Sequence, residues 1–249
     1  MPRQPAHGGD DLRESLAALS RLAIGQLDLT NLLIRVAEYA VAAIPGADGA
    51  GLTLMEEGHG DTIVASAQFV AEVDAIQYGI GEGPCITAAM EARTVRSGEL
   101  SGEARWPQFG PRAAGLGVHS VLSLPLLTPD RVVGAMNVYA HRQHAFNDKS
   151  VLIGELFAVP AAIAVQNAQV LAQTKRLAQQ LQAAMTSRAV IDQALGILMS
   201  RAGSTAEEAF DRLRERSQAD NAKLRDVAHR VIDQAVRRAR PRQTNPGVR

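Results

Sequence analysis

The sequence predicts an α+β protein with three parts: an N-terminal domain built on a mainly antiparallel sheet with flanking helices, a long connecting helix, and an all-α C-terminal bundle of three helices. Three observations lead to this fold class. Residues 10–43 repeat apolar side chains at spacings of three and four, as helices do. Residues 49–140 contain strand-like runs separated by turn residues. From residue 148 the helical spacing returns, and strands bracketed by long helices favour an α+β domain.

The front of the chain is expected to form two helices within residues 10–43, separated near Gly25. Two strands should follow at 49–55 and 62–68, with a hairpin loop at 57–61 between them, because Gly, His and Asp interrupt the apolar run there.

The strongest hairpin signal lies at residues 118–127 and 131–140, where apolar and small polar residues alternate on both sides of a Thr-Pro-Asp turn. Pro125 cannot donate to a strand ladder, so its strand should lie at a sheet edge or end there.

One long helix is predicted over residues 148–182, and its spacing continues into the C-terminal part. Pro160 should kink or break it. Residues 166–185, rich in Ala and Gln, suit a helical connector or short coiled coil in a homodimer, with an ordinary surface helix as the alternative.

The C-terminal part reads as three short helices that stabilise one another as a bundle. Gly196, inside the first, indicates that a neighbouring helix comes close. Gly203 should end that helix, and Thr205 with Glu208 forms a capping box for the second. Asn221 is expected to cap the third. The predicted apolar stripes are Ile191, Ala194, Leu195, Leu198, Met199 and Ala202, then Ala206, Ala209, Phe210 and Leu213, then Leu224, Val227, Ala228, Val231, Ile232 and Ala235.

Composition narrows the class of protein. The apolar content of 46% is ordinary for a soluble protein, and neither a secretory signal nor an apolar run of about 20 residues is visible, so a cytoplasmic protein without a membrane span is expected. Residues 1–10 and 241–249 read as a disordered lead and tail. Cys85 is the single cysteine, which excludes an internal disulfide, and the six histidines lack zinc-ligand spacing.

Charge divides the chain into an acidic front and a basic tail. Residues 1–173 hold 11 Lys and Arg against 18 Asp and Glu, and residues 174–249 hold 15 against 8. The net charges of −7 and +7 suggest that the tail meets a polyanion. The alternative is a solvated face with i,i+4 ion pairs, namely Glu208–Arg212, Asp226–Arg230 and Asp233–Arg237. Those pairs leave Arg188, Arg201, Arg214, Lys223, Arg225, Arg238 and Arg240 without an obvious partner.

Residues 188–234 carry a recognisable pattern: Q-A-L-G-I-L-M on a helix, a turn with A-G-S-T, then E-A-F-D-R-L-R and K-L-R-D-V-A. This pattern resembles the ANTAR module, a three-helix domain with which bacterial regulators, including actinobacterial ones, bind RNA and relieve transcription termination. The resemblance implies RNA as the partner, in the form of paired short hairpins in leader transcripts. The family usually has lysine where this chain has Leu195, which puts the strength of RNA binding in question.

The front of the chain resembles a GAF domain. The matching pieces are A-G-L-T-L from residue 50, G-I-G-E-G-P-C from residue 79, the strand that ends L-P-L, and V-G-A-M-N-V-Y from residue 133. The resemblance implies a sensory domain at 11–165, ahead of the connector at 166–185 and the ANTAR RNA-binding domain at 186–240. A small-molecule ligand in the GAF pocket is possible by resemblance, but its identity is unknown because the fold alone does not choose one.

Seven cations are the candidate RNA-binding residues, because guanidinium and ammonium groups bind phosphate and base edges. Phe210, the one aromatic residue after residue 173, is assigned to the core, so stacking on an aromatic platform is excluded as the main mode. The candidates are Arg188, Arg201, Arg212, Arg214, Arg216, Lys223 and Arg225.

Catalysis is not expected. Cys85 follows G-E-G-P at a predicted helix start, where a thiol can have a lowered pKa and act as a redox sensor, although a small buried thiol is the favoured alternative. One cysteine cannot run a cycle that needs a resolving partner. Two hypotheses therefore remain: an RNA-binding antiterminator with a GAF sensor, or a sensory dimerisation protein whose tail docks protein without RNA. DNA is the rival polyanion to RNA.

Overall fold

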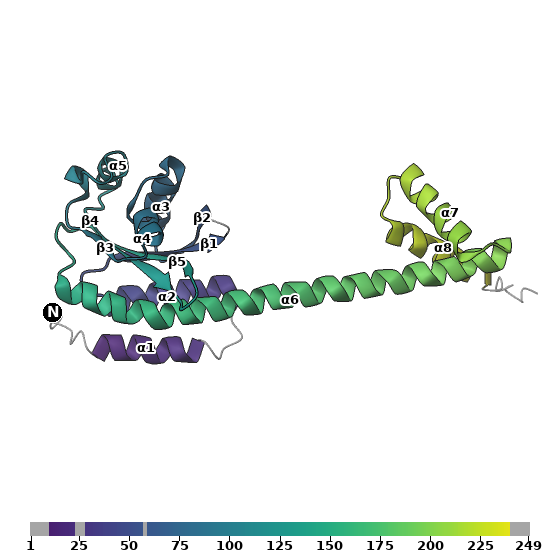
Figure 1. Cartoon of the computed structure of the whole chain (residues 1–249), viewed down its shortest axis with the longest axis horizontal. Coiled ribbons are helices and arrows are strands. Elements are labelled where there is room, and N and C mark those ends of the chain that lie inside the picture. Colours follow the sequence, from purple (N-terminus) through teal and green to yellow (C-terminus); the bar gives the residue numbers. More distant parts are fainter. Residues whose placement is uncertain (1–9, 23–27, 57–58, 240–249) are drawn as a thin grey trace, which may run out of the picture. The chain divides into compact units, whose positions relative to one another are not determined.

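The computed structural model describes residues 10–22, 28–56 and 59–239 (Figure 1). The chain forms two compact units, residues 1–173 and 174–249, each with its own apolar core. The disorder expected for the lead and the tail falls almost wholly on residues outside this description, as do Gly25 and Pro241.

Unit 1 is built on a five-stranded sheet in the order β2-β1-β5-β4-β3, and every neighbouring pair is antiparallel. The predicted α+β architecture with a mainly antiparallel sheet is therefore confirmed. The strands are β1 (Gly49–Glu56), β2 (His59–Ala65), β3 (Val95–Ser97), β4 (Ser120–Leu127) and β5 (Val132–Ala140).

Helices cover both faces of the sheet (Figure 1). On one face, α2 (Leu29–Ala43) and the first part of α6 (Asp148–Ala202) pack with β1, β4 and β5 in the larger core, and α1 (Asp10–Leu22) packs against α2. On the other face lie α3 (Gln68–Ile80), α4 (Pro84–Glu91), η1 (Leu100–Gly102) and α5 (Phe109–Gly115). This second core contains Trp106 and Phe109, both buried against sheet residues such as Tyr139.

The β4–β5 hairpin forms where alternation and turn chemistry predict it. The backbone N–H and the hydroxyl of Thr128 both donate to the carbonyl of Arg131, at 2.9 and 3.0 Å, and close the turn. Pro125 lies in β4, which is not the edge strand. However, β3 pairs only with Val121–Ser123, so at Pro125 no neighbour on that side requires an N–H.

The second strand begins earlier than predicted. β2 pairs with β1 from His59, opposite Glu56, and ends at Ala65, while Gln68 already begins α3. The predicted loop at 57–61 was wrong for residues 59–61, because pairing with a neighbouring strand outweighs the turn tendency of Gly60 and Asp61. Residues 57–58 lie outside the described part.

Helix α6 runs without interruption through 55 residues, Asp148–Ala202, and contains Pro160. Of the two outcomes predicted at Pro160, a kink or a break, the break does not occur. Proline removes only one helical hydrogen bond, the one to the carbonyl of Leu156, and the turn there is open to water because the Leu156 side chain is 52% exposed.

Helix α6 also contains an 18-residue window with a mean hydropathy of 1.6, which is apolar enough for a membrane span. No other helix of the described residues contains such a window. Of that window, 44% is buried inside the protein. Side chains such as Phe157 and Val165 are fully buried in the core beneath the sheet. The window is weak evidence for a membrane segment, since a core helix passes the same test.

Unit 2 consists of the last part of α6, α7 (Ala206–Ala219) and α8 (Leu224–Ala239), as the three-helix prediction requires. Gly203, at φ 62°, ends α6. The predicted capping box is present: the N–H of Glu208 donates to Thr205 Oγ1 at 3.3 Å, and the N–H of Thr205 donates to Glu208 Oε2 at 3.1 Å. The buried core is Ala194, Leu213, Val227, Ala228 and Val231.

Asn221 does not cap α8. It adopts φ 47° and closes α7 instead: its N–H donates to the carbonyl of Gln218 at 3.2 Å, and the N–H of Ala222 donates to that of Ser217 at 3.0 Å. This pair of bonds is a Schellman motif. Asparagine is common both at helix N-caps and in the left-handed conformation, so its presence alone cannot decide between the two roles.

Four predictions about packing in unit 2 were wrong. Ala202, expected on the apolar stripe of the first helix, is exposed near the end of α6. Ala206 is exposed and the Phe210 side chain is 38% exposed, because the core side of α7 is centred on Ala209 and Leu213 and Phe210 is turned about 100° from Ala209. Gly196 has no close neighbour, since a Cβ built there would meet no atom within 4 Å.

Candidate functional site

All seven cations named as RNA-binding candidates are exposed on unit 2. Arg188 and Arg201 lie on α6, and Lys223 and Arg225 lie at the start of α8. The other three, Arg212, Arg214 and Arg216, lie on α7 at every second position. Arg212 and Arg216 share one side of α7, whereas Arg214 is turned about 200° from Arg212. One RNA surface lying along α7 therefore meets either that pair or Arg214.

Ion pairing separates the candidates into two groups. Four of them pair with aspartates: Arg214–Asp211 at 2.9 Å, Arg225–Asp226 at 3.5 Å, Arg188–Asp192 at 4.0 Å and Arg216–Asp220 at 4.0 Å. The expectation that Arg188, Arg214 and Arg225 lack partners was wrong. The remaining candidates, Arg201, Arg212 and Lys223, form no ion pair with any described residue.

The three predicted i,i+4 ion pairs are also absent from the described residues. Glu208 is engaged in the capping box, which leaves Arg212 unpaired. Arg230 binds Asp220 across the α7–α8 connection, with Nη2 and Oδ2 2.5 Å apart, instead of binding Asp226. Exposed pairs of this kind contribute at most about 1 kcal/mol, so a phosphate can replace the aspartate partners.

The exposure of Phe210 removes the reason for excluding base stacking. Its ring is partly open to solvent on α7, and Arg214 lies one turn further along the same side of the helix. An aromatic ring beside an arginine can hold an unstacked base. Sequence reasoning missed this residue because it assigned Phe210 to the core stripe.

Leu195, which stands where the related family has lysine, is half-buried and packs against the core of unit 2. It extends the apolar stripe of α6, as its side chain predicts.

In unit 1, Cys85 lies in the first turn of α4 and is 2% exposed. Burial, and secondarily the nearby carboxyl of Asp74, raise the pKa of the Cys85 thiol to about 11. The lowered pKa expected at a helix start is not found, because loss of hydration outweighs the helix dipole here. The Tyr78 hydroxyl lies 3.0 Å from Sγ, and the N–H of Cys85 donates to Gln77 Oε1 at 3.1 Å. The thiol therefore matches the buried alternative.

A buried polar cluster surrounds Asp74, whose side chain is completely inaccessible. Its Oδ1 accepts from Tyr139 Oη at 2.6 Å, Gln77 Nε2 at 2.8 Å and Asn137 Nδ2 at 3.0 Å. Its Oδ2 has no hydrogen-bond partner among the described residues. Burial raises the pKa of Asp74 to about 6, although the three donors act in the opposite direction.

Two signals could have located this cluster. Asp74 and Gln77 fall on the buried side of α3 with Val70 and Val73, at the i, i+3, i+4 and i+7 positions of an apolar stripe. In the sheet, Asn137 is inward-facing and buried, and Ser123 on the paired strand donates to it. Buried polar residues on apolar faces are informative because an unpaired one is costly.

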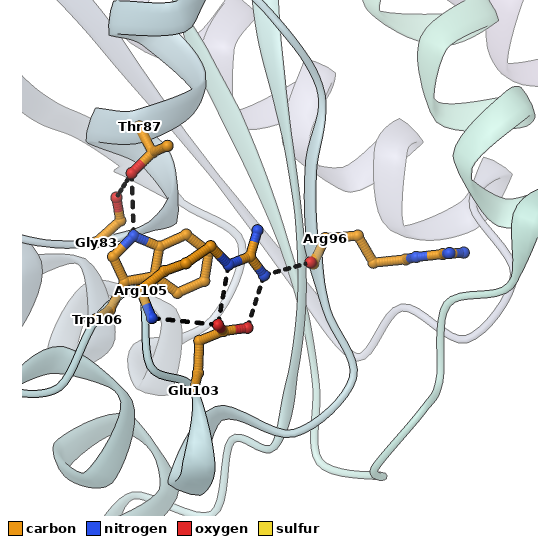
Figure 2. Close-up of polar contacts among 6 residues, drawn as sticks. All are labelled: Gly83, Thr87, Arg96, Glu103, Arg105 and Trp106. Atoms are coloured by element: carbon orange, nitrogen blue, oxygen red, sulfur yellow. Dashed lines mark hydrogen bonds and ion pairs between the residues drawn. The ribbon is translucent and has the colours of Figure 1, made fainter.

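A set of polar contacts joins the first turn of α4 to Trp106 and Arg105 (Figure 2). The Arg105 guanidinium lies 4.5 Å from the centre of the Trp106 ring and is held by Glu103 and by the carbonyl of Arg96. Trp106 Nε1 donates to Thr87 Oγ1 at 3.0 Å, and Thr87 Oγ1 donates to the carbonyl of Gly83 at 3.0 Å. The hydrogen bonds that Arg105 donates to the carboxylate of Glu103 lower the pKa of Glu103 to about 2.

Comparison with known families gives two matches. The model described as "GAF domain" matches residues 26–166, and the model described as "ANTAR domain" matches residues 179–232. No curated protein matches the sequence of this chain.

Solved structures match about two thirds of the chain. The GAF domain from a phosphoenolpyruvate-protein phosphotransferase of Coxiella burnetii has a TM-score of 0.52 at 15% identity, and the match covers 68% of this chain and 99% of that one. The free methionine-R-sulfoxide reductase of Neisseria meningitidis, in complex with its substrate, has a TM-score of 0.51 at 16% identity, covering 69% and 98%. The reduced fRMsr of Staphylococcus aureus has a TM-score of 0.51 at 14% identity, covering 66% and 99%. At these identities the likeness concerns the fold alone.

Proposed function

From the premise that this chain belongs to the GAF domain family and carries an ANTAR domain, we propose that it is an RNA-binding transcription regulator that acts by antitermination. GAF and ANTAR form a regulatory domain pair, with a sensory domain and an output domain. In this proposal the output binds paired RNA hairpins in a leader transcript, the protein works in the cytoplasm, and it catalyses no reaction.

The observation that carries the proposal is the ANTAR match over residues 179–232, within a unit whose net charge is +7. The exposed cations Arg201, Arg212 and Lys223 support it, since they form no ion pair with any described residue and can neutralise phosphates without first losing a partner. Leu195 adds no cation, but it strengthens the core that presents the others.

The proposed division of labour follows the two units. Residues 11–165 are the sensory domain, 166–185 the connector, and 186–240 the RNA-binding domain. The connector belongs to α6, which runs from the sensory domain into the RNA-binding domain as one helix. A continuous helix is suited to carry a change in one domain to the other.

We further propose that the chain is a homodimer joined along α6. Several large apolar side chains of α6 are at least half exposed: Leu152, Leu156, Val159, Ile163 and Leu177. The first four are spaced by four, three and four residues, and Leu177 follows Ile163 by two heptads, which is the pattern of a coiled-coil seam. A dimer presents two RNA-binding domains, which matches a target made of two hairpins.

The proposal is tested by the affinity of the full chain for a tandem-hairpin leader RNA across a salt series. The triple variant Arg201→Ala/Arg212→Ala/Lys223→Ala should weaken binding and flatten the dependence on salt, because each lost phosphate contact reduces the slope by about one. The matched control, Arg93→Ala/Arg112→Ala/Arg142→Ala, removes the same charge from exposed positions of unit 1 and should bind as the wild type does.

The second candidate function is a sensory dimerisation protein whose tail docks another protein. The exposed Phe210 favours this reading as much as it favours base stacking. A folded dimer that fails to bind the leader RNA at low salt would overturn the antiterminator proposal in favour of this candidate.

A further inference from the structure

Unit 2 contains an open hollow of about 470 Å³ between the last turns of α6 and helix α8. Its walls include Ile197, Ile232 and Ala235, which are half-buried. Its exposed rim is formed on α6 by Gln193, Ser200 and Arg201. The volume falls within the range of about 300–1,000 Å³ that small-molecule sites occupy.

Gly196 keeps this hollow open. It lines the hollow in the interior of α6, where glycine is less favourable than alanine. Close packing does not explain the residue, because a Cβ at this position would meet no atom within 4 Å. A larger side chain at position 196 would occupy the mouth of the hollow.

The chemistry of the hollow fits a planar ring with polar atoms at its edge and a negatively charged group attached beside it. The apolar walls can cover the face of a ring. Gln193 and Ser200 make no side-chain hydrogen bond with described residues, so their amide and hydroxyl groups are available to ring-edge atoms. Arg201 forms no ion pair with described residues and can bind a phosphate with two parallel N–H groups.

We propose that the hollow receives one unstacked base of an RNA hairpin loop, with Arg201 bound to the phosphate beside that base. The inference rests on the proposed RNA-binding function and names the part of unit 2 that reads the loop. Unstacked loop bases are where proteins usually read RNA sequence, and the +7 charge of unit 2 matches a polyanion.

The test combines a variant that fills the hollow with RNAs that lack single loop bases. Gly196→Leu places a side chain in open space and improves helix propensity, so the protein should remain folded with an unchanged or higher Tm. For the wild type, removing one particular loop base should weaken binding by about five- to a hundredfold. Gly196→Leu should weaken binding of the intact RNA by a similar factor and bind that abasic RNA no more weakly than the intact one.

The two changes are therefore expected to be non-additive, as they are when both remove one contact. The control Ala202→Leu adds the same side chain to an exposed position of α6 outside the hollow and should keep the wild-type preference for the intact loop. If the wild type binds RNA and Gly196→Leu discriminates the abasic loop equally well, the base pocket is overturned while the proposed function stands. If the wild type binds no RNA, both are overturned.

Discussion

At the residue scale, Asp74 combines complete burial with a carboxylate oxygen that no described residue satisfies. Its pKa is raised from 3.8 to about 6 in the folded protein. Between those values the folded state binds more protons than the unfolded state, so the free energy of unfolding falls as pH rises from about 4 to 6. The two pKa values correspond to an effect on the order of 3 kcal/mol.

Asp74→Asn should remove this pH dependence, because an amide does not titrate. Urea unfolding of both proteins at pH 4 and pH 7 measures it. The wild type should lose stability relative to the variant on going to pH 7, whatever constant difference the buried amide introduces. Equal changes in the two proteins would show that Asp74 is already ionised at pH 4 and would contradict the raised pKa.

Phe210 belongs to the same scale but to the other unit. Because its side chain is 38% exposed, Phe210→Ala should cost little stability. If the ring stacks on a loop base, the same change should weaken RNA binding by about five- to a hundredfold.

Leu213→Ala is the matched contrast to the Phe210 variant, since Leu213 is 1% exposed and lies in the core of the bundle. It should cost about 2–5 kcal/mol of stability. Thermal unfolding and RNA titration of both variants separate the two roles. If Phe210→Ala is destabilised as much as Leu213→Ala, Phe210 contributes to the core of the bundle and the prediction is wrong.

At the scale of elements, the end of α7 depends on Asn221 in the left-handed conformation, at φ 47°. Asn221→Ala should destabilise unit 2 by about 1 kcal/mol, because a Cβ without a compensating polar group is disfavoured there. Asn221→Gly should be at least as stable as the wild type, since glycine adopts positive φ freely. Circular dichroism melts of the three proteins give the order, and an alanine variant as stable as the glycine one would contradict the Schellman assignment.

Most elements defined by neighbours in sequence could be predicted, with Asn221 and Pro160 as the exceptions, and those defined by distant partners could not. The capping box at Thr205 and the β4–β5 turn involve only residues close in sequence, so the residue types at those positions predict them. The start of β2 depends on pairing with β1, and the Asp74 cluster joins residues that are 63 and 65 positions apart. The exposure of Phe210 depends on which side of α7 the other two helices cover. Of the candidate RNA contacts, sequence reasoning therefore found the cations and missed the exposed ring and the hollow.

At the scale of the whole molecule, the proposed dimer depends on the exposed apolar residues of α6. Leu177 is 57% exposed and lies on the proposed seam, whereas Gln179 is exposed and is turned about 200° away from it. Leu177→Lys should shift the protein toward monomer, and Gln179→Lys should leave the dimer intact. Sedimentation equilibrium across a concentration series distinguishes the two variants. A wild type that sediments as a monomer would contradict the proposed dimer along α6.

The same pair of variants links oligomeric state to RNA binding. A dimer with two RNA-binding domains should bind a tandem-hairpin RNA more tightly than a single hairpin, by about 10²- to 10⁴-fold, because the second contact forms within the complex. Leu177→Lys should lose that advantage while keeping the affinity for a single hairpin, since both mutated residues lie outside the proposed RNA-binding domain at 186–240. Gln179→Lys should keep the advantage. Equal affinities of the wild type for the two RNAs would mean that one domain acts alone, and the helix between the units would then carry its signal without pairing.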